Sequence, residues 1–128
     1  MMNENDLAKI AVDISLKIHK ILGPGLLESV YESAFALELT KRNIRFARQK
    51  GIDAFYEGEN LGLGFRADLI LDDKLLIELK SIENIQKVHH KITLTYMKLT
   101  NIKLGLLINF NVELIKEGIH RKIQGQLV

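Results

Sequence analysis

Residues 64–81, GFRADLILDDKLLIELKS, decide the fold of this chain, because they set three charged residues on two short strands joined by a polar turn. Two runs rich in Leu and Ile flank residues 72–74 (DDK), which is the pattern of a hairpin. Side chains alternate along a strand, so Glu78 and Lys80 share one face of the second run. The opposite face is apolar and can enter a core.

The length of the turn decides whether Asp68 joins this charged face. A two-residue loop at positions 72–73 pairs Asp68 with Ile77 and places it on the face opposite Glu78. A three- or five-residue loop sets Asp68 directly across from Glu78, with Cβ atoms roughly 4.5–5.5 Å apart. Two carboxylates at this separation repel unless a cation lies between them. The alternative is an ordinary exposed hairpin, in which Lys80 makes a surface ion pair worth about 0–1 kcal/mol.

Length and composition indicate a single domain over residues 1–128. Cysteine is absent, which excludes disulfides and thiolate metal sites. The polar, acidic N-terminus does not resemble a signal peptide, and no apolar run approaches the ~18 residues of a membrane span. We therefore expect a soluble protein of the cytoplasm with no membrane partner. The net charge of +2 is too small to indicate a nucleic-acid partner by itself. Two basic groups could meet phosphates or form solvated faces: Lys41, Arg42, Arg45, Arg48 and Lys50, and Lys116, His120, Arg121 and Lys122.

The first 42 residues predict two helices separated by Gly23-Pro24-Gly25. The first runs from about residue 6 to 22. The second runs from about residue 26 to 42, and its first turn contains Glu28, where the helix dipole favours a carboxylate. The expected buried stripes are Leu7, Ile10, Ile14, Ile18 and Ile21 in the first helix, and Leu27, Val30, Ala34 and Leu37 in the second.

The rest of the chain predicts a mixed sheet with one crossover helix. Residues 44–56 form a strand, and a turn over 57–63 leads into the strand that contains Asp68, so that with the strand of Glu78 an antiparallel meander results. A helix over 82–101, buried through Ile85, Val88, Ile92, Thr95 and Leu99, leads by a right-handed crossover to a buried parallel strand at 104–110. Residues 112–123 are expected to form a small edge hairpin turning at Glu117-Gly118.

This order of elements, with D…ExK on the second and third strands, resembles the PD-(D/E)XK nuclease superfamily. Five blocks are similar, more narrowly, to those of the GxxExxY proteins, and they occur in the same order between about residues 14 and 123: GLLESVY (25–31), QK (49–50), RAD (66–68), IELK (77–80) and GLLINF (105–110). The resemblance implies an α/β (mixed α+β) fold with a restriction-endonuclease-like core.

The resemblance also implies a site and an activity. It makes Asp68, Glu78 and Lys80 the catalytic residues of a nuclease that hydrolyses phosphodiester bonds. The metal ligands for Mg²⁺ or Mn²⁺ would be Asp68, Glu78 and Glu28, supported by Tyr31, Gln49 and Tyr96. The implied partner is nucleic acid. The sequence leaves both DNA and RNA open, with DNA favoured, and the apolar helix faces and strand edges could support a homodimer.

The chain departs from the family at Ile92, where a glutamine is usual four residues before the tyrosine that corresponds to Tyr96. Losing that amide removes a polar group that could orient water or phosphate. A non-catalytic nucleic-acid-binding or protein-interaction module on the same fold is therefore the alternative function. On either interpretation, two like charges meeting in a cleft predict that at least one of Asp68 and Glu78 has a raised pKa.

Overall fold

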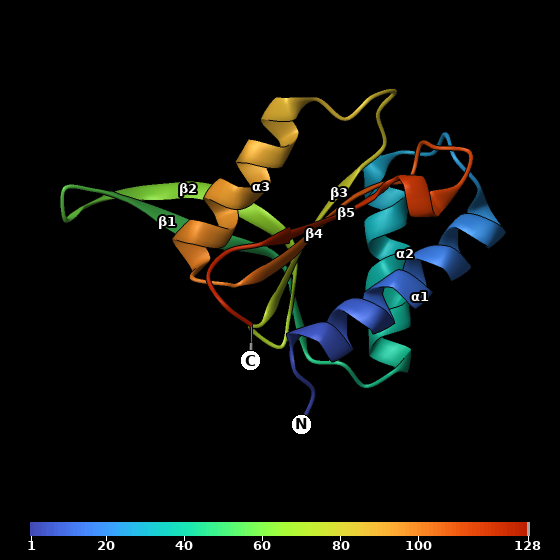
Figure 1. Cartoon of the computed structure of the whole chain (residues 1–128), viewed down its shortest axis with the longest axis horizontal. Coiled ribbons are helices and arrows are strands. Elements are labelled where there is room, and N and C mark those ends of the chain that lie inside the picture. Colours follow the sequence, from blue (N-terminus) through green and yellow to red (C-terminus); the bar gives the residue numbers. More distant parts are fainter. Residues whose placement is uncertain (128) are drawn as a thin grey trace.

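The computed structural model describes residues 1–127, in which one mixed sheet separates two helices on one face from a third helix on the other (Figure 1). The sheet order is β1-β2-β3-β4-β5, with β3 parallel to β4 and the other neighbours antiparallel. This is the fold class that the sequence predicts. The elements are α1 (Glu4–Leu22), α2 (Glu28–Lys41), β1 (Phe46–Tyr56), β2 (Glu59–Leu71), β3 (Leu75–Lys80), α3 (Lys87–Thr100), β4 (Leu104–Asn109), a 3₁₀ turn (Ile115–Glu117) and β5 (Ile119–Ile123).

Helix α1 starts two residues before the predicted position because of a reciprocal cap. The Asp6 amide donates to the Asn3 side chain at 2.8 Å, and the Asn3 amide donates to the Asp6 carboxylate at 3.0 Å. The helix ends where Gly23 adopts a φ of 71°, which glycine reaches without steric cost. None of the helices in residues 1–127 is long and apolar enough to cross a membrane.

Helix α2 buries a different face from the predicted one. Tyr31 and Phe35 are fully buried, whereas Leu27 is 74% exposed and Leu37 is 55% exposed. The Tyr31 ring stacks on Phe110, with centroids 4.4 Å apart and planes within 5°. Aromatic rings bury more surface than leucine side chains, so the line of aromatic residues faces the core and the leucines face outward.

Tyr31 ties α2 to the corner that precedes it. Its hydroxyl donates to the Gly23 carbonyl at 2.6 Å and accepts from the Leu26 amide at 3.1 Å. The Leu26 carbonyl in turn accepts from the Ser81 hydroxyl at 2.6 Å, so the corner is held to the end of β3.

Replacing Tyr31 by Phe should lower the free energy of unfolding by about 1–3 kcal/mol, because the stacked ring remains while two backbone groups lose their partner. Urea denaturation followed by circular dichroism measures the change. Tyr56, which is 65% exposed on β1, supplies the control. Tyr56→Phe should cost less than about 0.5 kcal/mol, and equal costs for both variants would contradict the structural role of the Tyr31 hydroxyl.

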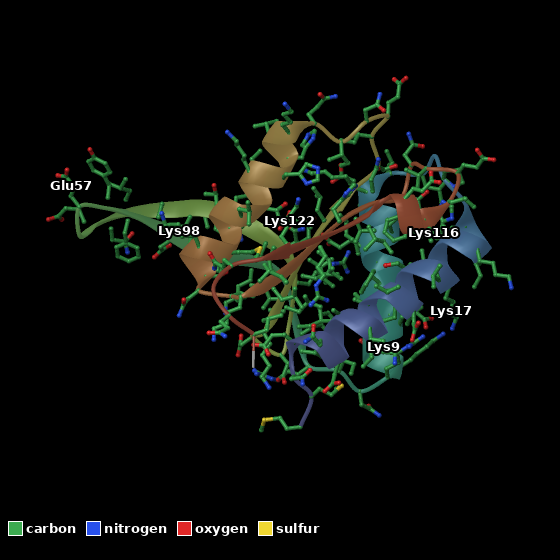
Figure 2. All side chains as sticks on the ribbon, viewed as in Figure 1. Lys9, Lys17, Glu57, Lys98, Lys116 and Lys122 are labelled. Carbon is green, nitrogen blue, oxygen red and sulfur yellow. The ribbon has the colours of Figure 1, made fainter. Side chains whose placement is uncertain are left out.

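Strands β1 and β2 form a long hairpin that projects from the body of the protein, and Figure 2 shows Glu57 at its tip. The predicted turn over residues 57–63 is too long. The turn is Glu57-Gly58, with φ of 49° and 81°, and Tyr56 pairs with Glu59. Positive φ at both central residues matches the twist of the flanking strands, so the ladder resumes at once.

The β2–β3 register resolves the uncertainty about the turn in residues 64–81. Leu69 pairs with Ile77 and Leu71 pairs with Leu75, which leaves residues 72–74 as a three-residue loop. One step further along this register, Asp68 lies opposite Glu78. The odd loop is therefore the one that forms.

Helix α3 starts five residues later than predicted, at a cap formed by Gln86 and His89, and the side chain of Asn109 holds Ile82 at the start of the preceding segment. Its Oδ1 accepts from the Ile82 amide at 3.1 Å and its Nδ2 donates to the Ile82 carbonyl at 2.9 Å. The predicted buried stripe is also wrong. Val88 is 54% exposed, while Met97 is fully buried. Met97 fits because Gly105 on β4 has no Cβ, which would lie 2.6 Å from the Met97 sulfur.

The C-terminal hairpin forms between β4 and β5 and not within residues 112–123. Ile115–Glu117 is a 3₁₀ turn where the first arm of that hairpin was predicted. β5 extends the edge of the sheet, as expected, by pairing antiparallel with β4 from Leu104↔Ile123 to Ile108↔Ile119. β4 matches the predicted buried strand, and all of its residues are buried.

Candidate active site

Asp68 and Glu78 face each other where β2 and β3 stop pairing. The Asp68 Oδ2 atom accepts from the Leu79 amide at 2.8 Å, and the Glu78 Oε1 atom accepts from the Asp68 amide at 3.2 Å. Each carboxylate thus satisfies a backbone amide at the end of the ladder. The backbone fixes both acids on one face, which is the arrangement that the odd loop predicts.

Both carboxyl groups resist ionisation. Burial and, secondly, the nearby Asp68 charge raise the pKa of Glu78 from 4.5 to about 8, while Lys80 acts in the opposite direction. Burial also raises the pKa of Asp68. The expectation that at least one of the two acids has a raised pKa is therefore confirmed, and desolvation is the larger cause in each case.

Lys80 and Tyr96 complete the surroundings of the acid pair. Lys80 lies two residues after Glu78 on β3 and pairs with Asn109 in the parallel ladder. Tyr96 projects from α3, where its ring stacks on Phe65 with centroids 3.7 Å apart and planes within 2°. Burial raises the pKa of Tyr96, and the charges of Glu78 and Asp68 raise it further, so the phenol lies within electrostatic range of both acids.

Two other sequence-predicted members of the site, Glu28 and Tyr31, lie elsewhere on α2, whereas a third, Gln49, contacts Asp68. Glu28 is exposed in the first turn and lines a pocket of about 510 Å³ together with Ser29, Ser81 and Asn111. No hydrogen bond or ion pair in residues 1–127 joins it to Asp68 or Glu78, and its role as a metal ligand stays a prediction. Tyr31 is a core residue that holds the helix corner, as described above.

The acid of α2 that does reach the pair is Glu32, one turn after Glu28, which sequence reasoning did not select. Its Oε1 accepts from the Gln49 amide nitrogen at 2.5 Å, and the same nitrogen donates to Asp68 Oδ1 at 3.0 Å. Arg48 donates to Glu32 Oε2 at 2.6 Å. The available signal was the position of Glu32 next to Tyr31, on the helix face that proves to be buried.

A model of the PD-(D/E)XK nuclease superfamily matches residues 5–122 of the chain. The chain belongs to this superfamily. Neither a curated protein nor a solved structure gives a significant match to the chain. In this PD-(D/E)XK chain, β2 contains Asp68 and β3 contains Glu78 and Lys80, and β3 pairs antiparallel with β2 and parallel with β4.

Divalent metals are typical of PD-(D/E)XK proteins, and the donor chemistry of this site fits them. In residues 1–127 no group of three or more His, Cys, Asp or Glu side chains is arranged to hold a metal ion. Two facing carboxylates nevertheless suffice for Mg²⁺, which keeps several waters and takes one or two protein carboxylates. Oxygen donors also suit Mn²⁺. Burial of both acids, together with the Asp68 charge at Glu78, disfavours the doubly ionised pair, and a cation would offset that cost.

The first basic group of this PD-(D/E)XK chain is largely neutralised by its own acids. Arg45 contacts Asp72 and Asp73 at 3.0 Å, and Arg48 contacts Glu32. Lys41 and Arg42 lie 3.9 and 3.7 Å from Glu38. In the second group, Lys116, Arg121 and Lys122 make no ion pair within the part of the chain that the structure describes. Of the two groups, the second has more positive charge available for a phosphate backbone.

Proposed function

We propose that this chain is a Mg²⁺- or Mn²⁺-dependent nuclease of the GxxExxY group, which hydrolyses phosphodiester bonds of nucleic acid, DNA rather than RNA. The observation that carries the proposal is the Asp68–Glu78 pair, held face to face by backbone amides and destabilised as two anions. Acids whose pKa values are raised by burial together with a neighbouring charge are typical of functional sites. A bound divalent cation would supply the missing positive charge.

The residues of the chain divide the chemistry between them. Asp68 and Glu78 would hold the cation, which polarises a phosphate oxygen and lowers the pKa of water when bound. The Lys80 ammonium, on the same face as Glu78, would orient the attacking water, assist its deprotonation and offset the charge that develops on the phosphate. The ring of Tyr96, stacked on Phe65, would lie near the two acids. No serine, histidine or cysteine nucleophile is needed.

A cleavage panel tests the proposal most directly. Single- and double-stranded DNA and RNA are incubated with the protein and Mg²⁺, Mn²⁺ or EDTA, and products are resolved by electrophoresis. Cleavage should require metal, and Lys80→Ala should reduce its rate at least about 100-fold, because the lysine acts on the reacting water and phosphate. Lys98→Ala, on α3, is the control and should retain activity (Figure 2).

One observation favours the alternative, a non-catalytic nucleic-acid-binding or protein-interaction module. Ile92, which replaces the usual glutamine, is 38% exposed on α3 and offers no polar group. Binding of nucleic acid that is indifferent to metal and to Asp68→Asn, without cleavage of any substrate in the panel, would establish the module and overturn the nuclease. The homodimer stays a prediction, for which Ile21 on α1 and Leu37 on α2 provide exposed apolar side chains that line one pocket.

A further inference from the structure

A continuous line of hydrogen bonds connects helix α2 to Asp68. It begins at Arg48, whose guanidinium donates to Glu32 Oε2 at 2.6 Å. Gln49 then bridges Glu32 and Asp68, because its Nε2 donates to Glu32 Oε1 at 2.5 Å and to Asp68 Oδ1 at 3.0 Å. The line ends at the Leu79 amide, which donates to Asp68 Oδ2. Both oxygens of Asp68 are thus engaged, one by β3 and one by the side chain of Gln49.

Gln49, whose side chain bridges Glu32 and Asp68, has an unusual backbone conformation. Gln49 has a φ of 52°, in the left-handed region that non-glycine residues rarely adopt. Such a conformation costs about 1–3 kcal/mol and persists only where its surroundings enforce it. A side-chain amide nitrogen has two N–H donors, so Gln49 can serve both carboxylates at once. These contacts hold the Gln49 side chain between α2 and Asp68.

The burial of Glu32 does not by itself explain its contact with Gln49. A second buried acid on the same helix, Glu38, makes no such contact. Glu38 is 8% exposed, which equals the exposure of Glu32. Its partners are cations alone, with Lys17 at 3.0 Å and Lys41 and Arg42 near 4 Å. Glu32 instead uses one oxygen for Arg48 and gives the other to the residue that contacts Asp68. A buried acid on α2 can therefore be satisfied without any contact to the site.

We propose that Glu32 is a positioning residue of the site, which sets the orientation of Asp68 through the side chain of Gln49. This proposal rests on the proposed function in one respect, namely that Asp68 is oriented in order to hold a cation. Glu32 touches neither substrate nor metal in this role. It acts as the partners of metal ligands generally act, by fixing the direction of the ligand before the ion arrives.

The orientation of Asp68 can be read in the protein without metal, from the exchange of the Leu79 amide with deuterated water. Exchange reports local opening, and comparison with the Ile108 amide of buried β4 removes the effect of global stability. Glu32→Leu and Gln49→Leu should each speed Leu79 exchange about tenfold relative to Ile108. Glu32→Gln keeps an oxygen acceptor for Gln49 and should stay within about twofold of wild type.

Glu38→Leu is the matched control, because it removes an equally buried acid from the same helix at the end near Lys17. It should lower global stability and leave the Leu79 to Ile108 ratio unchanged. If Glu32→Leu and Gln49→Leu also leave the ratio unchanged, or if Glu38→Leu changes it equally, the positioning role is overturned.

Mn²⁺ binding, measured by electron paramagnetic resonance of the free ion, tests whether the orientation of Asp68 contributes to cation binding. Glu32→Leu and Gln49→Leu should weaken binding about 10-fold or more, as loss of a ligand's partner does elsewhere, while Glu38→Leu should not. Unchanged affinity despite faster Leu79 exchange would overturn the role in cation binding. If the wild type binds no Mn²⁺, the proposed nuclease fails, and the exchange measurement still decides whether Glu32 positions Asp68.

Discussion

Asp68→Asn should abolish the stabilisation of this protein by Mn²⁺. A ligand that binds only the folded state at 100 times its dissociation constant adds about 2.7 kcal/mol to the free energy of unfolding. The wild type should show a gain of this size, because the cation relieves the repulsion between Asp68 and Glu78. The asparagine variant should show none, since one of the two charges is gone.

Without metal, the free energy of unfolding of Asp68→Asn should lie within about 1 kcal/mol of that of the wild type. Repulsion with Glu78 is relieved, but the amide has one oxygen for two donors, Gln49 and the Leu79 amide. Thermal melts with Mn²⁺ and with EDTA measure both effects, and Asp13→Asn, at an exposed position on α1, is the control. Equal Mn²⁺ shifts in Asp68→Asn and the wild type would place the ion elsewhere and remove the physical basis of the nuclease.

Glu78→Gln should flatten the pH dependence of stability. Because the pKa of Glu78 rises from 4.5 to about 8 on folding, the folded protein binds a proton more tightly than the unfolded chain. That contribution is fully present below pH 4.5 and is lost as pH rises to about 8. A tenfold change in proton affinity corresponds to about 1.4 kcal/mol, so the wild type should lose up to about 4 kcal/mol over this range. The raised pKa of Asp68 adds a smaller loss of the same sign.

Urea denaturation in EDTA at pH 5, 7 and 9 measures this loss. Glu78→Gln retains an oxygen that can accept from the Asp68 amide, so its stability should change little with pH apart from the part due to Asp68. Glu57→Gln, at the tip of the β1–β2 hairpin, should follow the wild type (Figure 2). A wild-type slope that survives in Glu78→Gln would mean that another group binds the proton.

The order of elements could be predicted from the sequence because it depends on local patterns, whereas the register of the acid pair could only be narrowed to alternatives. Residues 104–110 are apolar apart from Asn109, which is typical of a strand covered on both faces, and the structure confirms this strand. The loop over residues 72–74 allowed two registers. Periodicity alone could not choose between them, yet only the odd one brings Asp68 to Glu78.

Which stripe of a helix faces the core could not be predicted, because α2 and α3 each contain two lines of apolar residues. In α2 the choice depends on Phe110, which lies far along the chain and stacks on Tyr31. Glu28 and Glu32 are four residues apart and lie on the same side of α2 as Tyr31. Glu28 is exposed in the first turn, whereas Glu32, one turn further along, is buried and contacts Gln49. The family resemblance selected the first of these acids, and only the structure distinguishes them.

The three-residue loop at positions 72–74 also determines the order in which the site assembles during folding. Asp68 and Glu78 meet when a short segment closes, whereas β3 reaches β4 only after the whole crossover through α3. The entropy lost on closure grows with the length of the closed segment, and non-local pairing is slow. We therefore expect the two like charges to come together before the parallel ladder fixes Lys80 beside Asn109. Repulsion between them should oppose closure of this hairpin, and protonation of either acid should favour it.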